Sequence, residues 1–402
     1  MNVGIDIAAM ATGHYALDLR FLAVARSVDP RKYTTGLGQD FMSVASPQED
    51  VVTMGVEAGL RALEHVSDPT TIRLVLFATE SSVDQSKSAG IYIHHFLGLN
   101  PSCRVVELKQ ACYSATAALH IATAFVRQNP AAQALIIASD IARYGLNTSG
   151  EPTQGCGAVA LVVSANPRVL VVETTTGVYT RHIMDFWRPN GQDAACVNGR
   201  YSALAYLEAL SKTWADFQCN GGGSVGQIDF MCYHTPFTKM AEKAFARHTE
   251  IARSIQRGGQ YLPAFLPSAV LYGRRLGNCY TASLYISLLS LLENTAQDLA
   301  GARVGLFSYG SGCVAEFFTG VLAPGYQNVL FAEAHTAAIA QRALLTVSEY
   351  EAFYTQSRDP VCVPEVRYYT GPLCFLGVKD HQRHYRLTLC NTESCTQVRL
   401  VS

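Results

Sequence analysis

No apolar segment among the 402 residues approaches the roughly 20 residues that a membrane-spanning helix needs. No run of lysine or arginine stands out, and the formal net charge is −1, so the basic footprint of a nucleic-acid-binding protein is absent. The first eight residues alternate like a strand and lack the charged start and long apolar stretch of a signal peptide. We therefore expect a soluble, cytoplasmic protein that binds neither nucleic acid nor membranes.

Metal-binding and nucleotide-binding motifs are also missing. The 12 cysteines are scattered from Cys103 to Cys395, no C-x-x-C occurs, and no histidine lies at a zinc-like spacing. The sequence has no P-loop and no dinucleotide-binding fingerprint. In a reducing compartment most of these cysteines should be small apolar core residues, and we expect neither a metal nor a cofactor.

Apolar residues make up 49% of the chain and charged residues only 16%, which predicts large buried surfaces in two domains or in one fold of two halves. Short β-branched runs predict buried strands, and the segments between them have helical spacing. Strands are expected at 74–78, 104–108, 134–138, 159–164, 229–233 and 304–307, and helices at 51–66, 115–127 and 282–292. The alternation predicts an α/β fold with parallel or mixed sheets.

One short motif occurs twice. Residues 112–115 read Cys-Tyr-Ser-Ala and residues 279–282 read Cys-Tyr-Thr-Ala, and each opens a helix rich in small residues. Downstream, Gly-Ala-Val-Ala at 157–160 follows the first copy, and Gly-Cys-Val-Ala at 312–315 follows the second. Two matches in the same order favour an internal duplication.

The boundary between the copies is expected at Asn166-Pro167, where a turn signal follows a predicted strand. This gives an N-terminal half at 1–167 and a C-terminal half at 168–402. In open α/β folds, ligand sites form at the carboxyl ends of strands. A duplicated fold would therefore bring residues of both halves to one cleft.

Three reactive side chains stand where predicted strands end. Cys112 lies between a strand and a helix whose N–H groups favour a thiolate, although a core cysteine at a tight turn is the alternative. Glu80 is either a helix cap or a site residue. His234 follows a strand, where a lone histidine more often only satisfies hydrogen bonds. Together, a thiol, a carboxylate and an imidazole at such positions would supply a nucleophile, a base and an electrophilic partner.

Two glycine-containing segments follow predicted strands. Residues 145–157 (GLNTSGEPTQGCG) are rich in turn-forming residues, and their simplest interpretation is a surface connection. Residues 307–312 (FSYGSG) read as a strand that runs into a glycine turn, which can present backbone N–H groups to an oxyanion. We expect N–H groups around Cys112 and Ser311 to stabilise such a charge.

A series of short motifs runs almost the whole length of the chain. In order they are VDPRKY at 28–33, GLGQ at 36–39, ATESSVD at 78–84, ELKQACYSAT at 107–116, ARYGLN and GEPTQG within 142–155, DFWRP at 185–189, HTPFTKM at 234–240, GN-x-YT at 277–281, FSYGSG at 307–312 and DHQR at 380–383. In this order and spacing they resemble the 3-hydroxy-3-methylglutaryl-coenzyme A synthase family, and its bacterial form most closely. The resemblance implies a homodimer with a thiolase-like fold, in which two βαβαβαββ-type halves form a five-layer αβαβα sandwich.

The resemblance also implies roles for single residues. By match to the family motifs, Cys112 would be the acetyl-accepting nucleophile, Glu80 the general acid/base, and His234 the residue that positions acetoacetyl-CoA. The matched positions for substrate and coenzyme A are Asp29, Pro30, Ser149, Thr153, Ser202, Lys239, Lys243, Asn278 and Ser311. The two lysines of this set lie four residues apart, hence on one face if the segment is helical, and could meet coenzyme A phosphates. The first half then carries Glu80 and Cys112, and the second carries His234, Asn278 and Ser311.

A few positions depart from the family pattern. Cys156 and Cys279 stand where the family has alanine or another apolar residue, and we expect an apolar core to tolerate them. Ser149 aligns where some relatives have asparagine. Residues 9–13 replace an aromatic-Val-Pro segment that family members often have.

The reaction implied by the resemblance condenses acetyl-CoA with acetoacetyl-CoA and water to give 3-hydroxy-3-methylglutaryl-CoA and CoA, in the mevalonate pathway of isoprenoid synthesis. It needs no metal or redox cofactor. One alternative is a polyketide β-branching synthase, which performs the same chemistry on an acyl-carrier-protein thioester. Another is a catalytically inactive member of the fold, which would have lost at least one of Cys112, Glu80 and His234.

Overall fold

One mixed β-sheet runs through the whole molecule. The computed structural model describes residues 1–255, 264–265, 267–357, 359–388 and 399–401. The strands of the sheet lie in the order β11 (Phe230–Tyr233), β12 (Arg303–Gly310), β13 (Val314–Leu322), β8 (Leu170–Thr180), β1 (Val3–Thr12), β7 (Cys156–Ala165), β6 (Gln133–Ile141), β4 (Ile72–Ala78) and β5 (Arg104–Leu108). Each strand predicted from an apolar run is present, within a few residues of its expected bounds.

The two halves of this sheet repeat one pairing pattern. In the first half β5–β4 and β4–β6 are parallel, whereas β6–β7 and β7–β1 are antiparallel. In the second half β11–β12 is parallel, and β12–β13 and β13–β8 are antiparallel. A parallel bridge between Phe230 and Ala264 stands where the first half has β5. The halves meet at β1 and β8, which pair only at Gly4 and Ile5. The predicted duplication is confirmed.

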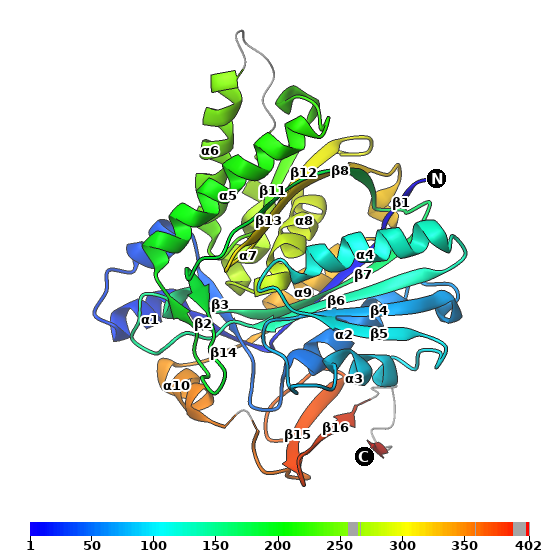
Figure 1. Ribbon diagram of the computed structural model, residues 1–402. Coiled ribbons are helices and arrows are strands. Elements are labelled where there is room, and N and C mark those ends of the chain that lie inside the picture. Colours follow the sequence, from blue (N-terminus) through cyan, green and yellow to red (C-terminus); the bar gives the residue numbers. More distant parts are fainter. Residues whose placement is uncertain (256–263, 266, 358, 389–398, 402) are drawn as a thin grey trace.

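Helices cover the outer faces of the half-sheets and fill the space between them (Figure 1). The outer helices are α2 (Val51–Leu63) and α3 (Ala89–Phe96) on the first half, and α5 (Gly199–Cys219) and α6 (Thr238–Ile255) on the second. Helices α4 (Ser114–Gln128) and α8 (Ser283–Asn294) form the middle layer. The result is the αβαβα arrangement of a thiolase-like fold, as the resemblance implied.

The middle layer explains why its two helices are so apolar. Helix α4 buries one stripe at helical spacing, made of Ala115, Ala118, Leu119, Ala122 and Val126. Helix α8 is buried at every position from 283 to 292, because both half-sheets enclose it. One continuous apolar cluster joins these helices to the inner faces of both half-sheets. None of the helices in the described ranges is both long and apolar enough to span a bilayer.

Smaller elements lie around the five layers. A small sheet of β14 (Ala343–Leu344), β2 (Tyr15–Asp18) and β3 (Phe41–Val44) lies beside α1 (Leu19–Ala25) and α10 (Val347–Thr355). The remaining short elements are β9 (Phe186–Trp187), β10 (Cys196–Val197), α7 (Leu271–Leu276) and α9 (Ala332–Ala340). Strands β15 (Leu373–Lys379) and β16 (Gln382–Leu387) pair with each other and are here called the C-terminal hairpin; β16 also pairs with β17 (Arg399–Val401). The hairpin lies against α2 and α3 (Figure 1), where Tyr385 contacts the rings of Tyr92 and Phe96.

Candidate active site

Cys112 lies in the turn between β5 and α4. The turn is closed by Ser114, whose hydroxyl accepts a hydrogen bond from the Gln110 backbone N–H at 2.6 Å and donates one to the Ala111 carbonyl at 2.9 Å. Ala111 has the left-handed φ of 43°, so the chain turns sharply just before the thiol. Cys112 is 8% exposed, and its exposed part opens into a cavity.

Glu80 faces this thiol from the end of the neighbouring strand β4. The Cys112 Sγ donates a hydrogen bond to the Glu80 Oε1 at 3.0 Å. The backbone N–H of Glu80 is bound by Asp140 at 2.9 Å, and its carbonyl accepts a hydrogen bond from Arg188 at 2.9 Å. Glu80 does not cap the next helix, because Ser88 caps α3. The helix-cap alternative is therefore wrong.

The electrostatics of this pair favour a shared proton. Burial of the carboxyl group, reinforced by Asp140, raises the pKa of Glu80 from 4.5 to about 8, although Cys112 and Arg188 oppose the rise. Burial and the Glu80 carboxylate raise the pKa of the Cys112 thiol well above its usual 9. The expectation that the helix start holds Cys112 as a thiolate is therefore wrong for the free site, because burial, and after it the nearby carboxylates, raise the pKa of the thiol. Ionisation of the thiol must accompany transfer of its proton, and Glu80 is in place to accept it.

His234 reaches the same cavity from the other half of the molecule. Its backbone is fixed at the end of β11, where its N–H bonds to the Phe307 carbonyl and its carbonyl accepts from the Tyr206 hydroxyl, both at 2.8 Å. The ring Nδ1 is buried and has no hydrogen-bond partner among the described residues. Burial lowers the pKa of His234 to about 3, so the imidazole is neutral and can exchange hydrogen bonds with a ligand oxygen.

Asp140, which the sequence analysis did not single out, holds the two halves together at the site. One carboxylate oxygen accepts hydrogen bonds from the Thr79 hydroxyl at 2.8 Å and from the backbone N–H groups of Glu80 and Ser81. The other oxygen accepts from the Thr281 hydroxyl at 2.7 Å and from the Thr281 N–H at 3.1 Å. Asp140 thus fixes Glu80 relative to the second half. Its signal in the sequence was an acidic residue ending an apolar strand, the same signal that pointed to Glu80.

Asp185 likewise holds segments of the site together by hydrogen bonds, at the glycine turn after β12. Its carboxylate accepts hydrogen bonds from the Tyr309 hydroxyl at 2.7 Å, the Ser202 hydroxyl at 3.1 Å and the Gly312 N–H at 2.9 Å. The predicted strand and glycine turn at 307–312 are present, and Ser311 lines the cavity. Asp185 therefore sets the position of the glycine turn, which packs against the turn that carries Cys112 at Gln110 and Tyr113.

The cavity has a volume of about 350 Å³. Its lining includes Cys112, His234 and five of the predicted ligand positions, namely Ser149, Thr153, Ser202, Asn278 and Ser311. Aromatic rings of Tyr144, Phe186 and Tyr280 pack edge to face beside the thiol. The site thus combines an apolar wall with a few polar groups, as small-molecule sites usually do.

The other predicted ligand positions lie outside the cavity lining. Asp29 and Arg31 form an exposed pair at 2.6 Å, with Pro30 between them. Lys239 bonds to Glu242 at 2.5 Å and shares helix α6 with Lys243. In the chain, Leu37 and Phe237, which line the cavity, lie after Pro30 and before Lys239, respectively.

The segment 145–157 is not a plain surface connection. It contains a 3₁₀ turn at Glu151–Thr153 and is buried from residue 151 onward. Arg26 holds Glu151 with two hydrogen bonds of 2.8 and 2.7 Å, and the Tyr350 hydroxyl adds a third at 3.3 Å. This buried ionic contact fixes the loop that carries Ser149 and Thr153 to the cavity.

The second copy of the duplicated motif contributes differently from the first. Cys279 is fully buried, as expected for a cysteine in place of an apolar residue, and Cys156 is also buried. Tyr280, with a left-handed φ of 42°, turns into the cavity lining. The duplication therefore supplies a thiol from one half and an aromatic wall from the other.

Comparison with known proteins identifies the family. The family model described as hydroxymethylglutaryl-coenzyme A synthase N terminal matches residues 2–168, and its C-terminal counterpart matches 170–255 and 265–358. The hydroxymethylglutaryl-CoA synthase of Enterococcus faecalis is 41% identical over 359 residues, which cover 89% of this chain and 93% of that protein. The chain belongs to the hydroxymethylglutaryl-CoA synthase family.

Solved members of the hydroxymethylglutaryl-CoA synthase family have the same fold throughout. An HMG-CoA synthase complexed with CoA superposes with a TM-score of 0.88 at 39% identity, covering 96% of this chain and 99% of that one. MvaS in complex with 3-hydroxy-3-methylglutaryl coenzyme A has a TM-score of 0.89 at 35% identity and the same coverage. The polyketide biosynthesis 3-hydroxy-3-methylglutaryl-ACP synthase PksG of Bacillus subtilis is 33% identical over 380 residues, 89% of each chain. The family thus includes enzymes named for CoA and for carrier-protein thioesters.

Proposed function

We propose that this protein condenses acetyl-CoA with acetoacetyl-CoA and water to give 3-hydroxy-3-methylglutaryl-CoA and CoA. The observation that carries the proposal is the 3.0 Å contact between the Cys112 thiol and the Glu80 carboxylate, at the edge of a cavity that Cys112 and His234 both line. The 41% identity with the Enterococcus faecalis enzyme supports it. Membership of the mevalonate pathway and a cytoplasmic location are further parts of this proposal.

The first step is acetyl transfer to Cys112. The thiol attacks the thioester carbonyl of acetyl-CoA while its proton passes to Glu80. Collapse of the tetrahedral intermediate breaks the bond to the CoA sulfur, which takes this proton from Glu80 and leaves as the thiol, so that Glu80 is ionised again. Proton transfer to Glu80 is needed because the surrounding carboxylates oppose a free thiolate. Backbone N–H groups around Cys112 and Ser311 are our candidates to stabilise the oxyanion of the tetrahedral intermediate.

The second step forms the carbon–carbon bond. Ionised Glu80 removes a proton from the methyl group of acetyl-S-Cys112, and the resulting enolate attacks the ketone carbon of acetoacetyl-CoA. His234, which is neutral, stabilises the alkoxide that develops on the ketone oxygen and directs its protonation. Water then cleaves the thioester at Cys112, which releases 3-hydroxy-3-methylglutaryl-CoA and restores the thiol.

The proposed binding residues divide along the cavity. Ser149, Thr153, Ser202, Asn278 and Ser311 would contact the acyl and pantetheine portions, since they line the cavity. Asp29, Pro30, Lys239 and Lys243 would contact the nucleotide end at its mouth, where the two lysines can meet phosphate groups. The reaction as written needs no metal and no redox cofactor.

A homodimer is part of the proposal. Strand β5 has only β4 as a sheet partner among the described strands, and its Val106 is 47% exposed. On the adjoining helix α4, Ile121 is 45% exposed. An open strand edge with apolar side chains is a common association surface. Sedimentation equilibrium tests it, and a mass equal to one 43.6 kDa chain at micromolar concentration would contradict it.

The decisive experiment for the function is mass spectrometry after mixing the protein with acetyl-CoA alone. We expect one acetyl group on the Cys112 peptide, followed by formation of 3-hydroxy-3-methylglutaryl-CoA when acetoacetyl-CoA is added. Acetylation of a different cysteine would remove the central step. Faster turnover of an acetoacetyl carrier protein than of acetoacetyl-CoA would favour the polyketide β-branching alternative, which the similarity to PksG keeps open.

A further inference from the structure

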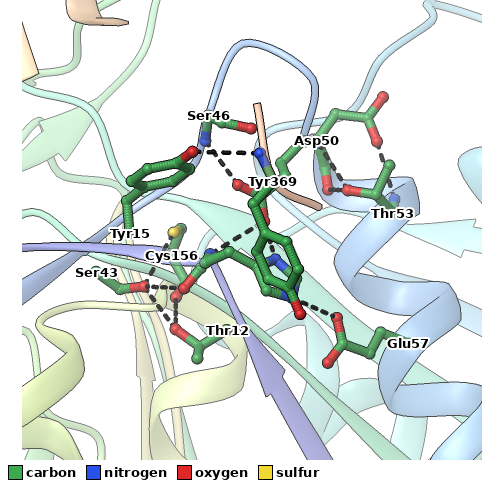
Figure 2. A network of polar contacts seen from close by, with 12 residues as sticks. Thr12, Tyr15, Ser43, Ser46, Asp50, Thr53, Glu57, Cys156 and Tyr369 are labelled. Atoms are coloured by element: carbon green, nitrogen blue, oxygen red, sulfur yellow. Dashed lines mark hydrogen bonds and ion pairs between the residues drawn. The ribbon is translucent and has the colours of Figure 1, made fainter. Parts of the chain in front are cut away.

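The C-terminal hairpin lies beyond the part of the chain that the family models match, which ends at residue 358. It is nevertheless fixed to the first half by polar contacts. The Gln48 side chain accepts hydrogen bonds from the backbone N–H groups of Arg367 and Tyr368 at 2.6 and 2.9 Å. The Tyr15 hydroxyl accepts one from the Tyr369 N–H at 3.2 Å (Figure 2). The segment that leads into the hairpin is therefore held in one position.

Arg383 of β16 is the residue that this docking brings into the first half. Its side chain is 8% exposed and lies over the Phe375 ring, 5.0 Å from the centroid. The guanidinium pairs with Asp359 and lies 3.7 Å from Asp50. It also donates a hydrogen bond to the Val83 carbonyl at 3.3 Å. A buried guanidinium needs such partners to offset the loss of water around its charge, and the contacts restrict the positions of the partner groups.

The carboxylate of Asp50 is itself fixed, so Arg383 has a rigid reference point. One Asp50 oxygen caps helix α2 by accepting from the N–H groups of Val52 and Thr53, both at 2.9 Å. The other oxygen accepts from the Tyr385 hydroxyl at 2.7 Å. Figure 2 shows Asp50 at the start of α2, beside Thr53. Arg383 is thus oriented by a helix terminus and by its own strand.

Val83, the contact of Arg383, lies three residues after Glu80. Residues 81–88 form neither helix nor strand and are mostly polar, so few contacts within the segment can fix it. Before Val83, the backbone is held at the Glu80 N–H by Asp140 and at the Glu80 carbonyl by Arg188. After Glu80, the backbone is held at the Val83 carbonyl by Arg383, which lies 300 positions away in the chain.

We propose that Arg383 is a positioning residue for Glu80, through its hydrogen bond to the Val83 carbonyl, its buried contact with Asp50 and its ion pair with the exposed Asp359. The C-terminal hairpin thereby takes part in the chemistry of the site without touching the substrate. The consequence for the reaction rests on the proposed function, in which Glu80 is the base. The consequence for the thiol does not, because the Glu80 carboxylate faces Cys112 in the free protein.

Two measurements on the full chain test the proposal, with Arg383→Met as the variant and Arg386→Met as the matched control. Arg386 lies on the same strand, but it binds the Pro364 carbonyl rather than the first half. The first measurement is kcat for condensation. Arg383→Met should lower kcat about 10- to 100-fold, which is the effect of displacing a catalytic group by about an ångström. Arg386→Met should change kcat less than about twofold, as expected for a contact remote from the site.

The second measurement is the pH dependence of Cys112 alkylation by iodoacetamide. A displaced Glu80 carboxylate raises the thiol pKa less, so the midpoint in Arg383→Met should move to lower pH, whereas Arg386→Met should keep the wild-type midpoint. In a Glu80→Gln background, Arg383→Met should cause no further movement, because the charge that it positions is gone. A purely structural role for Arg383 would lower the melting temperature without this dependence on Glu80.

Several outcomes would overturn the proposal. One is a folded Arg383→Met protein whose Cys112 is alkylated with the wild-type pH dependence, and another is an equal shift in the Glu80→Gln background. If Arg383→Met does not fold, Arg383→Lys keeps the charge but cannot span both Val83 and Asp50, and it must show the same shift in part. If the wild-type protein forms no 3-hydroxy-3-methylglutaryl-CoA, the proposed function is contradicted. The role of Arg383 is not, because the alkylation measurement does not depend on turnover.

Discussion

Replacing Glu80 by glutamine should make the protein more stable at alkaline pH while it removes the condensation activity. Glutamine has almost the same shape and keeps an oxygen that can accept the Cys112 hydrogen bond, but it carries no charge. Comparing the two proteins therefore measures how much the ionised Glu80 carboxylate lowers the free energy of unfolding. Active-site residues often lower the stability of a protein in this way, since the environment that shifts their pKa also destabilises their charged form.

The magnitude follows from the pKa of the group. Burial of the carboxyl group, with Asp140 adding to the effect, raises the pKa of Glu80 from 4.5 to about 8. The folded protein then binds more protons than the unfolded chain between these values, so stability falls as pH rises through this window. At about 1.36 kcal/mol per pKa unit, the loss above pH 8 is at most about 5 kcal/mol. Since the residue keeps some contact with solvent, we expect about 2–3 kcal/mol to be measured.

Urea unfolding of wild type and Glu80→Gln at pH 5 and pH 8.5 would measure this difference. We expect the variant to gain most of its advantage at pH 8.5 and little at pH 5, where Glu80 is protonated in the folded protein. Cys112→Ala serves as a control for loss of activity without loss of the carboxylate. The reasoning would be refuted by a Glu80→Gln protein that is less stable than wild type at pH 8.5, or by a stability difference that is the same at both pH values.

The remaining predictions concern the thiol, the imidazole and two buried acids. Cys112→Ala should abolish acetyl transfer, and mass spectrometry that still finds one acetylated cysteine would contradict this. His234→Ala should raise KM for acetoacetyl-CoA and leave acetylation of Cys112 intact. Burial lowers the pKa of His234 to about 3. The pH–rate profiles of wild type and variant should therefore have the same shape around pH 6.5. Asp140→Ala leaves the donors of Glu80 and its neighbours unpaired and should destabilise by about 3 kcal/mol or more in urea unfolding; a loss under about 1 kcal/mol would show that water replaces it. Glu151→Ala leaves the buried Arg26 with the half-exposed Glu351 as its ionic partner, so it should cost less than the loss of an isolated buried pair, about 1–3 kcal/mol measured in the same way, with Glu151→Asp recovering part of the loss.

Most of the architecture could be read from the sequence because its strands are buried on both faces. The run at 74–78 is apolar without alternation, and it forms β4, which lies between two parallel neighbours. The duplicated Cys-Tyr motif marked the two helices of the middle layer, α4 and α8. Cys112, Glu80 and His234 were found by the same logic, since each stands where a strand ends.

The parts that the sequence did not reveal depend on contacts between distant segments. Arg26 and Glu151 are 125 residues apart, and without that pair the turn-rich segment at 145–157 reads as exposed. The protonation of Cys112 was predicted wrongly because its local signal is a helix start, whereas the burial and the carboxylates that raise the thiol pKa come from segments far away in the chain. Asp140 stood at the end of an apolar run, but its hydrogen bonds reach Thr281 in the other half.

The shared middle layer makes the protein a single cooperative unit. The apolar stripe of α4 and the fully buried α8 belong to one continuous cluster, so neither half can shield its inner face from water by itself. A fragment ending near residue 167 would expose that face and should aggregate rather than fold. The two similar halves are thus joined through one core, and we expect a chimaera of two relatives to fold only where the packing of α4 against α8 is matched.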